Sequence, residues 1–188
     1  MIKNGSGGTN TQSGVKYEGK VDLSAFLSKL NGYTVKSNYK DSGNGSRSKA
    51  YYVYFKNNLV AKIFKQNTIY KFLKNEYNLG WDNFISSRLI PDDSIYVVKS
   101  NTFYVIEVKH QEVSGSVDEK LQTCDFKKKQ WKKIVGQLNW NVEYIYLLSE
   151  WFKDKKYKDV LDYIHLVGCN YYFEYIDLKK LGLPIPKK

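Results

Sequence analysis

The chain has 188 residues, of which 42% are hydrophobic, 26% are charged and 16% are aromatic. This composition excludes a disordered or fibrous protein, and the length is typical of one domain that can bury its own core. Thirty Lys and Arg against nineteen Asp and Glu give a formal net charge of +11, which favours a polyanionic partner such as nucleic acid. Codon drift in an AT-rich genome remains an alternative source of the many lysines.

The sequence offers little for disulfide bonds, zinc binding or membrane insertion. It contains two Cys and two His, without a CxxC or HExxH pattern, which excludes a disulfide framework and a zinc site built from these residues. No segment approaches the ~20 consecutive apolar residues of a membrane span, and the N-terminus lacks the apolar core of a secretory signal. We therefore expect a cytoplasmic protein with no membrane-embedded part.

An N-terminal arm and a helix are the first predicted elements. Residues 1–14 are mainly Gly, Ser, Thr and Asn, which predicts a flexible arm and leaves 15–188 as a single domain. Four apolar residues then recur at helical spacing: Leu23, Phe26, Leu27 and Leu30. They predict a helix of about four turns that ends at Asn31 and Gly32.

Strands, a loop and a second helix follow this first helix. A β-prone segment is expected at 33–35, and the polar, basic residues 36–49 predict an exposed loop. Strands are expected over 51–55 and 59–64, and a helix over 68–79 that ends at the glycine after it.

The second half of the chain alternates between strands and helices. Apolar runs and helical spacing predict strands at 95–98, 103–108 and 142–148 and helices at 126–138 and 157–167. The first two strands form a hairpin, and Asp125 can cap the helix that follows them. This order predicts an α/β fold with a central mixed β-sheet that helices flank on both faces.

The predicted strand at 103–108 ends in an acid and a base. Alternation places Glu107 and Lys109 on the same face, and because both faces begin with apolar residues we expect this strand to be central. The hairpin would bring Asp92 alongside Glu107. Two carboxylates so close repel each other unless a proton or a cation lies between them, and Mg2+ prefers oxygen ligands. Asp93 is the alternative to Asp92, because alternation puts only one of them on the Glu107 face.

Several segments resemble those of one nuclease family. Pro91-Asp92 followed by Glu107-Val108-Lys109 resembles the PD-(D/E)xK motif, and the segments 7–18 and 115–123 resemble small type II restriction endonucleases. The resemblance implies a restriction-endonuclease-like sheet and Mg2+-dependent cleavage of both strands of double-stranded DNA at a short specific site, leaving 5′-phosphates. It also implies a homodimer and, in the cell, a cognate DNA methyltransferase that protects the same site.

The resemblance assigns roles to individual residues of the motif. It implies that Asp92 and Glu107 bind the metal, that the carbonyl of Val108 joins them, and that Lys109 positions or activates the attacking water. Glu18 matches an acidic residue that helps to build the metal site in many relatives, although its place on the helical wheel also suits a solvated residue.

Basic side chains in two regions are candidates for DNA binding. In the helix at 126–138, an apolar stripe through Phe126 and Trp131 opposes four lysines, which suit either a phosphate track or a solvated face: Lys128, Lys129, Lys132 and Lys133. Lys127 breaks this pattern. The loop from 37 to 49 could reach a DNA groove with Lys40, Arg47 and Lys49.

The remaining expectations concern base recognition and rival functions. Gln111 could support the active site or close the strand, and Arg47 and Arg88 alone could offer guanine a forked contact. The first rival function is a structure-selective nuclease on the same scaffold, such as a junction resolvase or a repair endonuclease. The second is a non-catalytic basic module that binds DNA.

Overall fold

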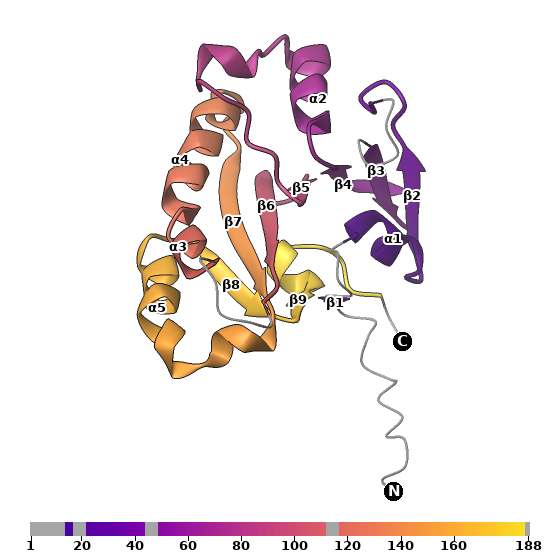
Figure 1. Ribbon diagram of the computed structural model, residues 1–188. Coiled ribbons are helices and arrows are strands. Elements are labelled where there is room, and N and C mark those ends of the chain that lie inside the picture. The colour runs from indigo at the N-terminus through magenta and orange to yellow at the C-terminus, as the bar shows by residue number, and fades with distance from the viewer. Residues whose placement is uncertain (1–13, 17–21, 44–48, 112–116, 187–188) are drawn as a thin grey trace, which may run out of the picture.

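A mixed seven-stranded sheet forms the centre of the protein. The computed structural model describes residues 14–16, 22–43, 49–111 and 117–186. The sheet has the order β2-β3-β4-β5-β6-β7-β8 (Figure 1). Its strands are β2 (Tyr33–Ser37), β3 (Ala50–Phe55), β4 (Asn58–Phe64), β5 (Asp93–Val97), β6 (Thr102–Lys109), β7 (Asn141–Leu148) and β8 (Asn170–Phe173). A second, two-stranded sheet pairs β1 (Gly14–Lys16) with β9 (Tyr175–Asp177).

The pairing of the strands changes once across the large sheet, from antiparallel to parallel. Strands β2 to β6 form an antiparallel meander, whereas β7 is parallel to β6 and β8 is parallel to β7. Parallel neighbours require crossover connections, and these hold helices. The α-helices are α1 (Leu23–Ser28), α2 (Thr68–Tyr77), α3 (Val117–Leu121), α4 (Cys124–Val135) and α5 (Lys158–Leu166). The 3₁₀ helices are η1 (Trp81–Asn83), η2 (Gly136–Leu138), η3 (Glu150–Lys153), η4 (Lys155–Tyr157) and η5 (Leu178–Leu181).

Each face of the sheet has its own hydrophobic core. Phe103 and Val105 of β6 point to the face that α2, α4 and α5 cover, while Tyr104 and Ile106 point to the face covered by α1 and η5. In Figure 1, α4 and α5 lie on one side of β6 and β7, and α1 lies on the other. Strand β6 is therefore central and buried on both faces, and the predicted α/β class with a mixed sheet flanked by helices is confirmed.

The predicted strands and most helices are confirmed, with ends that differ by up to three residues. The helix predicted over 126–138 runs from Cys124 to Val135, so Asp125 lies in its first turn and does not cap it. The helix predicted over 68–79 ends earlier, because Asn78 adopts a left-handed conformation (φ 51°) and its N–H bonds back to the carbonyls of Leu73 and Lys74. Asparagine tolerates this conformation better than most residues. The first helix is also shorter than predicted within the described part of the chain, since α1 has six residues and Asp22 caps it.

The prediction of an exposed loop over 36–49 is wrong for its first part. Asn38, Asp41 and Ser42 are buried. Asp41 accepts hydrogen bonds from Asn38 and from Asn75 of α2, the latter at 2.7 Å, and the Ser42 hydroxyl donates to the carbonyl of Asn38 at 2.7 Å. These polar side chains can be buried because they satisfy one another. Arg47 lies outside the described residues.

The predicted faces of α4 are also partly wrong. Phe126, expected in the apolar stripe, is 61% exposed, whereas Lys128, expected on the exposed basic side, is buried. The buried phase of α4 runs from Cys124 through Lys128 to Trp131. Lys128 fits there because its amino group pairs with Glu143 of β7 at 3.3 Å and donates to the carbonyl of Gly168. In the part of the chain that the structure describes, no helix has the length and apolar character to cross a membrane.

Candidate active site at the end of the central strand

Glu107 occupies the end of β6, where the strand leaves the core. Its carboxylate is on the face that α4 covers, and the residue is 7% exposed. Lys109, two residues later, shares this face and is more exposed. An acid and a base thus emerge together from a buried central strand, as the alternation predicted.

Two lysines hold the Glu107 carboxylate. The Nζ of Lys127 lies 2.7 Å from Oε1 and 2.9 Å from Oε2, and the Nζ of Lys109 lies 3.1 Å from Oε2. Lys109 comes from the same strand, whereas Lys127 comes from the first turns of α4. Both side chains remain partly exposed, with accessible fractions of 20% for Lys109 and 28% for Lys127. The cluster therefore combines a buried anion with two cations that solvent and a ligand can reach.

The electrostatic surroundings keep Glu107 ionised. Burial by itself would raise the pKa of the Glu107 carboxyl, but the charge of Lys109 and the hydrogen bond from Lys127 outweigh it, so the pKa falls below its usual range. Tyr144 of β7 adds to this effect. Its buried hydroxyl makes no regular hydrogen bond in the described structure, yet it lies close enough to Glu107 to stabilise the charge. The same burial and the negative charge of Glu107 raise the pKa of Tyr144.

Tyr146 forms a second aromatic wall of the site. It lies opposite Glu107 in the parallel register of β6 and β7, and the Lys109 ammonium is 6.0 Å from its ring centroid. Its hydroxyl donates to the carbonyl of Lys120 at 3.0 Å, which joins β7 to helix α3. The charged cluster is thus enclosed on one side by rings that limit its access to water.

The strand register separates Asp92 from Asp93. Asp93 pairs with Ile106, so its side chain faces the α1 side of the sheet, away from Glu107. Asp92 comes one residue earlier, opposite Glu107, and its Oδ2 accepts a hydrogen bond from the N–H of Val108 at 2.8 Å. Of the two aspartates left open by the sequence, Asp92 is the one on the Glu107 face.

Asp93 has a structural environment of its own. It is fully buried, and its carboxyl accepts hydrogen bonds from the N–H of Leu23 at 3.1 Å and from the N–H of Ser94 at 3.0 Å. Burial raises the pKa of Asp93 to about 7, although these N–H groups and Lys65 act in the opposite direction. The contact with Leu23 attaches the first turn of α1 to the start of β5.

The carboxylates of the site fit a hard divalent cation in their chemistry. Asp92, which directly precedes β5, and Glu107 of β6 bring oxygen donors to one end of the sheet, and Glu107 is held anionic. Among the residues that the structure describes, no three Asp, Glu, His or Cys side chains come together as a metal-binding group. Glu18, the other predicted acidic ligand, lies outside the described residues. Two carboxylates fit a magnesium ion that keeps several of its waters.

The other predicted site residues are distributed around the molecule. Lys129 pairs with Asp125 at 2.7 Å, Lys132 and Lys133 are exposed, and Lys40 pairs with Glu76 at 2.8 Å. Lys49 is half-buried.

Gln111 is buried, and its backbone exchanges hydrogen bonds with the Ser149 hydroxyl at 3.3 and 3.4 Å. Its main chain therefore closes the end of β6 against the residue that follows β7.

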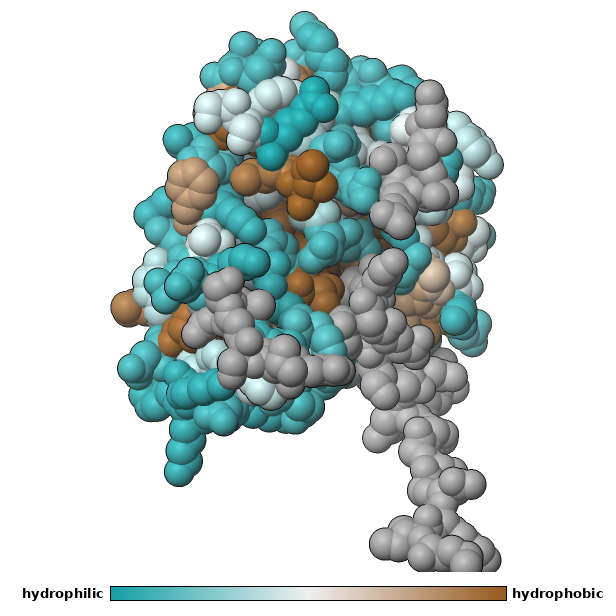
Figure 2. All heavy atoms as spheres, in the orientation of Figure 1, coloured by the Kyte–Doolittle hydropathy of each residue, from teal (hydrophilic) through white to brown (hydrophobic). Residues whose placement is uncertain are grey.

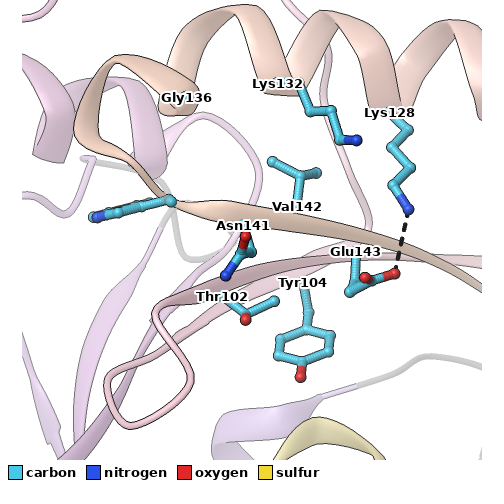
Figure 3. Close-up of a pocket in the computed structure, with 9 residues that line it drawn as sticks. Thr102, Tyr104, Lys128, Lys132, Gly136, Asn141, Val142 and Glu143 are labelled. Carbon is cyan, nitrogen blue, oxygen red and sulfur yellow. Dashed lines mark hydrogen bonds and ion pairs between the residues drawn. The ribbon is translucent and has the colours of Figure 1, made fainter.

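A cavity of about 470 Å³ lies at the opposite end of β6 from Glu107. Figure 3 shows Lys128 and Lys132 extending from α4 above Glu143 and Val142, with Tyr104 and Thr102 from β6 nearby. The ion pair between Lys128 and Glu143 neutralises much of the charge of this cavity. Lys128 is therefore separated from the exposed lysines that the sequence grouped with it.

Lys127 is the main site residue that sequence reasoning missed. The helical pattern marks it as a break in the first turn of α4, and such a break is a signal that a charged side chain faces inward to a partner. Tyr144 has no such signal, because a tyrosine in an apolar strand resembles any core residue. Its place beside Glu107 follows only from the parallel pairing of β6 with β7.

Comparison of the chain with protein-family models, with curated proteins and with solved structures gave no match. The interpretation of the site therefore depends on its own geometry and on the motif in the sequence.

Proposed function

We propose that this protein is a Mg2+-dependent DNA endonuclease with a PD-(D/E)xK active site formed by Asp92, Glu107 and Lys109. The observation that supports the proposal is the set of contacts at the end of β6, where the Val108 N–H donates to Asp92 at 2.8 Å and the Lys109 ammonium lies 3.1 Å from the Glu107 carboxylate. A non-catalytic basic module has no need for an anionic, buried acid at the end of a central strand. The net charge of +11 supports a polyanionic substrate.

The residues of the site would have different roles in phosphodiester hydrolysis. Asp92 and Glu107 would hold Mg2+, with the Val108 carbonyl and Glu18 as further ligands that the motif implies. The bound ion supplies charge neutralisation and lowers the pKa of a coordinated water. Lys109 holds or orients the attacking water beside the phosphate, and the exposed part of Lys127 offers a second cation to the non-bridging oxygens.

We further propose that the protein is a type II restriction endonuclease. Such an enzyme cuts both strands at a short site and leaves 5′-phosphates, works as a homodimer because one active site cuts one strand, and has a methyltransferase partner. A two-fold axis in the dimer would match a palindromic site.

Incubation of the full chain with a sequenced plasmid tests the proposal. With Mg2+ we expect discrete fragments with 5′-phosphate ends, and with EDTA we expect none. Cleavage of branched DNA but not of linear duplex would favour a junction resolvase or a repair endonuclease. Salt-sensitive binding with no cleavage under any divalent metal would favour a non-catalytic module and would refute the nuclease.

Two adjacent isosteric substitutions provide a matched control. Asp92→Asn removes a carboxylate from the Glu107 face and should abolish cleavage, whereas Asp93→Asn changes the buried carboxyl on the other face and should leave cleavage intact. Equal activity of the two variants would contradict the assigned site.

A further inference from the structure

A pocket of about 520 Å³ lies between α2, the loop before β3 and the segment that leads into β5. Its lining combines aromatic rings with charged groups, including Tyr70, Trp81 and Arg88. Figure 2 shows a largely hydrophilic face with a few apolar patches near its middle. The pocket is outside the Glu107 cluster, and the proposed hydrolysis does not use it.

Arg88 is held against the aromatic wall of this pocket. Its guanidinium carbon lies 4.9 Å from the ring centroid of Trp81 and 6.0 Å from that of Tyr70. The Tyr70 ring in turn stacks on Trp131 of α4, with centroids 5.5 Å apart and planes 17° apart. A planar guanidinium stacked on rings loses little further freedom when it binds a ligand, so Arg88 is oriented in advance.

The backbone next to Arg88 is also fixed. The Tyr70 hydroxyl donates to the carbonyl of Leu89 at 2.8 Å and accepts from the N–H of Leu89 at 2.9 Å. The Tyr70 side chain therefore holds Leu89 by two hydrogen bonds, and its ring packs near the guanidinium of Arg88. This arrangement locates Arg88 more rigidly than an ordinary exposed arginine.

The polar edge of Arg88 is unused within the described structure. It is exposed, and among the described residues no hydrogen bond or ion pair uses its N–H donors. Asp41, a carboxylate of the same pocket, is occupied by Asn38 and Asn75. Arg88 is also the only arginine in the described part of the chain, where lysines otherwise supply the positive charge. A stacked arginine with free donors is suited to two acceptor atoms in one plane.

Arg88 lies close to the proposed site along the chain. It precedes Asp92 by four residues, which an extended chain spans in at most about 14 Å. Base pairs of B-DNA repeat every 3.4 Å or so, so this reach covers about four base pairs from the phosphate at the site. Trp131, which supports Tyr70, is one helical turn after Lys127 on α4.

We propose that Arg88 is a DNA-contacting residue that makes a forked hydrogen-bonded contact to a pair of acceptor atoms beside the cleaved phosphate. This inference rests on the proposed function. The acceptors are either the O6 and N7 atoms of a guanine or two oxygens of a backbone phosphate. Trp81 and Tyr70 position the guanidinium and do not touch the DNA.

Binding of fluorescent duplexes in EDTA tests this contact without cleavage. The duplexes carry either the site mapped on the plasmid or an unrelated sequence. Arg88→Lys keeps the charge but loses the fork, Arg88→Ala loses both, and Lys99→Ala removes an exposed charge from the turn at the far end of the β5–β6 hairpin. Thermal unfolding of each variant separates a loss of binding from a loss of folding.

The two acceptor sources give different results. For a guanine contact, Arg88→Lys weakens binding to the mapped site by roughly 5- to 150-fold but not to the unrelated duplex. Replacing the guanine with 7-deazaguanine then weakens the wild type and not the variant. For a phosphate contact, both duplexes weaken alike, and Arg88→Ala lowers the salt dependence of log K by about one unit.

Other outcomes overturn the inference in distinguishable ways. If the wild type cuts and binds DNA, and both Arg88 variants match Lys99→Ala, Arg88 only packs against Trp81 and the proposed function survives. If the wild type neither binds nor cuts DNA, the proposed function fails and the Arg88 contact fails with it.

Discussion

Each face of the sheet carries a buried acid at the same end of the β5–β6 hairpin, and the pKa values of the two acids shift in opposite directions. On the α4 face, Glu107 meets the ammonium groups of Lys109 and Lys127 within 3.1 Å and remains anionic. On the α1 face, burial raises the pKa of Asp93 to about 7, because the backbone N–H groups of Leu23 and Ser94 do not offset it. Both acids are buried, but Glu107 is paired with two ammonium groups whereas Asp93 is bonded to backbone N–H groups.

This difference suits Glu107 to a role in catalysis and Asp93 to a role in holding the fold together. A carboxylate paired with partly exposed cations can exchange those cations for a metal ion and a phosphate. The Asp93 carboxyl, bonded to the first turn of α1, holds that helix in place, and its complete burial disfavours its charged form. The following experiments change one face at a time.

The largest effect is expected for Glu107→Gln on the α4 face. The substitution removes one metal-binding carboxylate, so plasmid cleavage should fall by at least about 1,000-fold, equivalent to about 4 kcal/mol of activation free energy. DNA binding should stay the same or tighten, because a negative charge near phosphate disappears. Rates measured with Mg2+ beside a circular dichroism spectrum check this, and a fully active, folded variant would contradict the comparison.

Asp93→Asn tests the α1 face through pH. The folded pKa of about 7 exceeds the ordinary value of 3.8, so this group's contribution to the free energy of unfolding is fully present below pH 4 and is lost as pH rises to about 7. The loss is at most about 4 kcal/mol. Asparagine can still accept from the Leu23 N–H.

Urea unfolding between pH 4 and 8 measures this dependence. The wild type should lose stability over that range relative to Asp93→Asn, and the two proteins should cleave DNA equally. If the free energy of unfolding changes with pH in the same way for both proteins, the Asp93 carboxyl is ionised over the whole range from pH 4 to 8.

The third test compares Lys127, which pairs with Glu107, with Lys65, whose charge lies near Asp93. Lys127→Met should lower cleavage by about tenfold or more, because a charge-assisted hydrogen bond to Glu107 is lost. Lys65, on the other face, pairs with Asp22 at 2.6 Å, and Lys65→Met should cost up to about 1 kcal/mol of unfolding free energy without changing cleavage. Cleavage rates and urea midpoints of both variants check this. A larger loss of cleavage in Lys65→Met would reverse the assignment of the faces.

The smallest effect is expected from exposed lysines on helices that cover the two faces. If α4 lies along DNA, Lys132→Ala with Lys133→Ala should lower the salt dependence of log K by about two units. Lys179→Ala with Lys180→Ala, on η5 of the opposite face, is the matched control and should change little. Equal slopes in both double variants would exclude α4 as the phosphate track.

Much of the fold and part of the site follow from local patterns. Apolar alternation predicts the hairpin of β5 and β6, and the same alternation places Glu107 and Lys109 on one face, because the period of a strand is two residues. The continuous apolar run of β7 predicts a strand covered on both sides, which the structure confirms. The motif spacing leaves Asp92 and Asp93 both open as the partner of Glu107, and only the resemblance favours Asp92.

Other features depend on which elements meet in space. The sequence by itself determined the α/β class, the central strand and the acid and base at its end, since these follow from local periodicity and from the length of one hairpin. Only the tertiary structure decided that Lys127 meets Glu107, that Lys128 is buried against Glu143, and that Asp93 accepts the N–H of Leu23, 70 residues away. Crossover connections set these contacts, and the register between distant elements leaves no local signal in the chain.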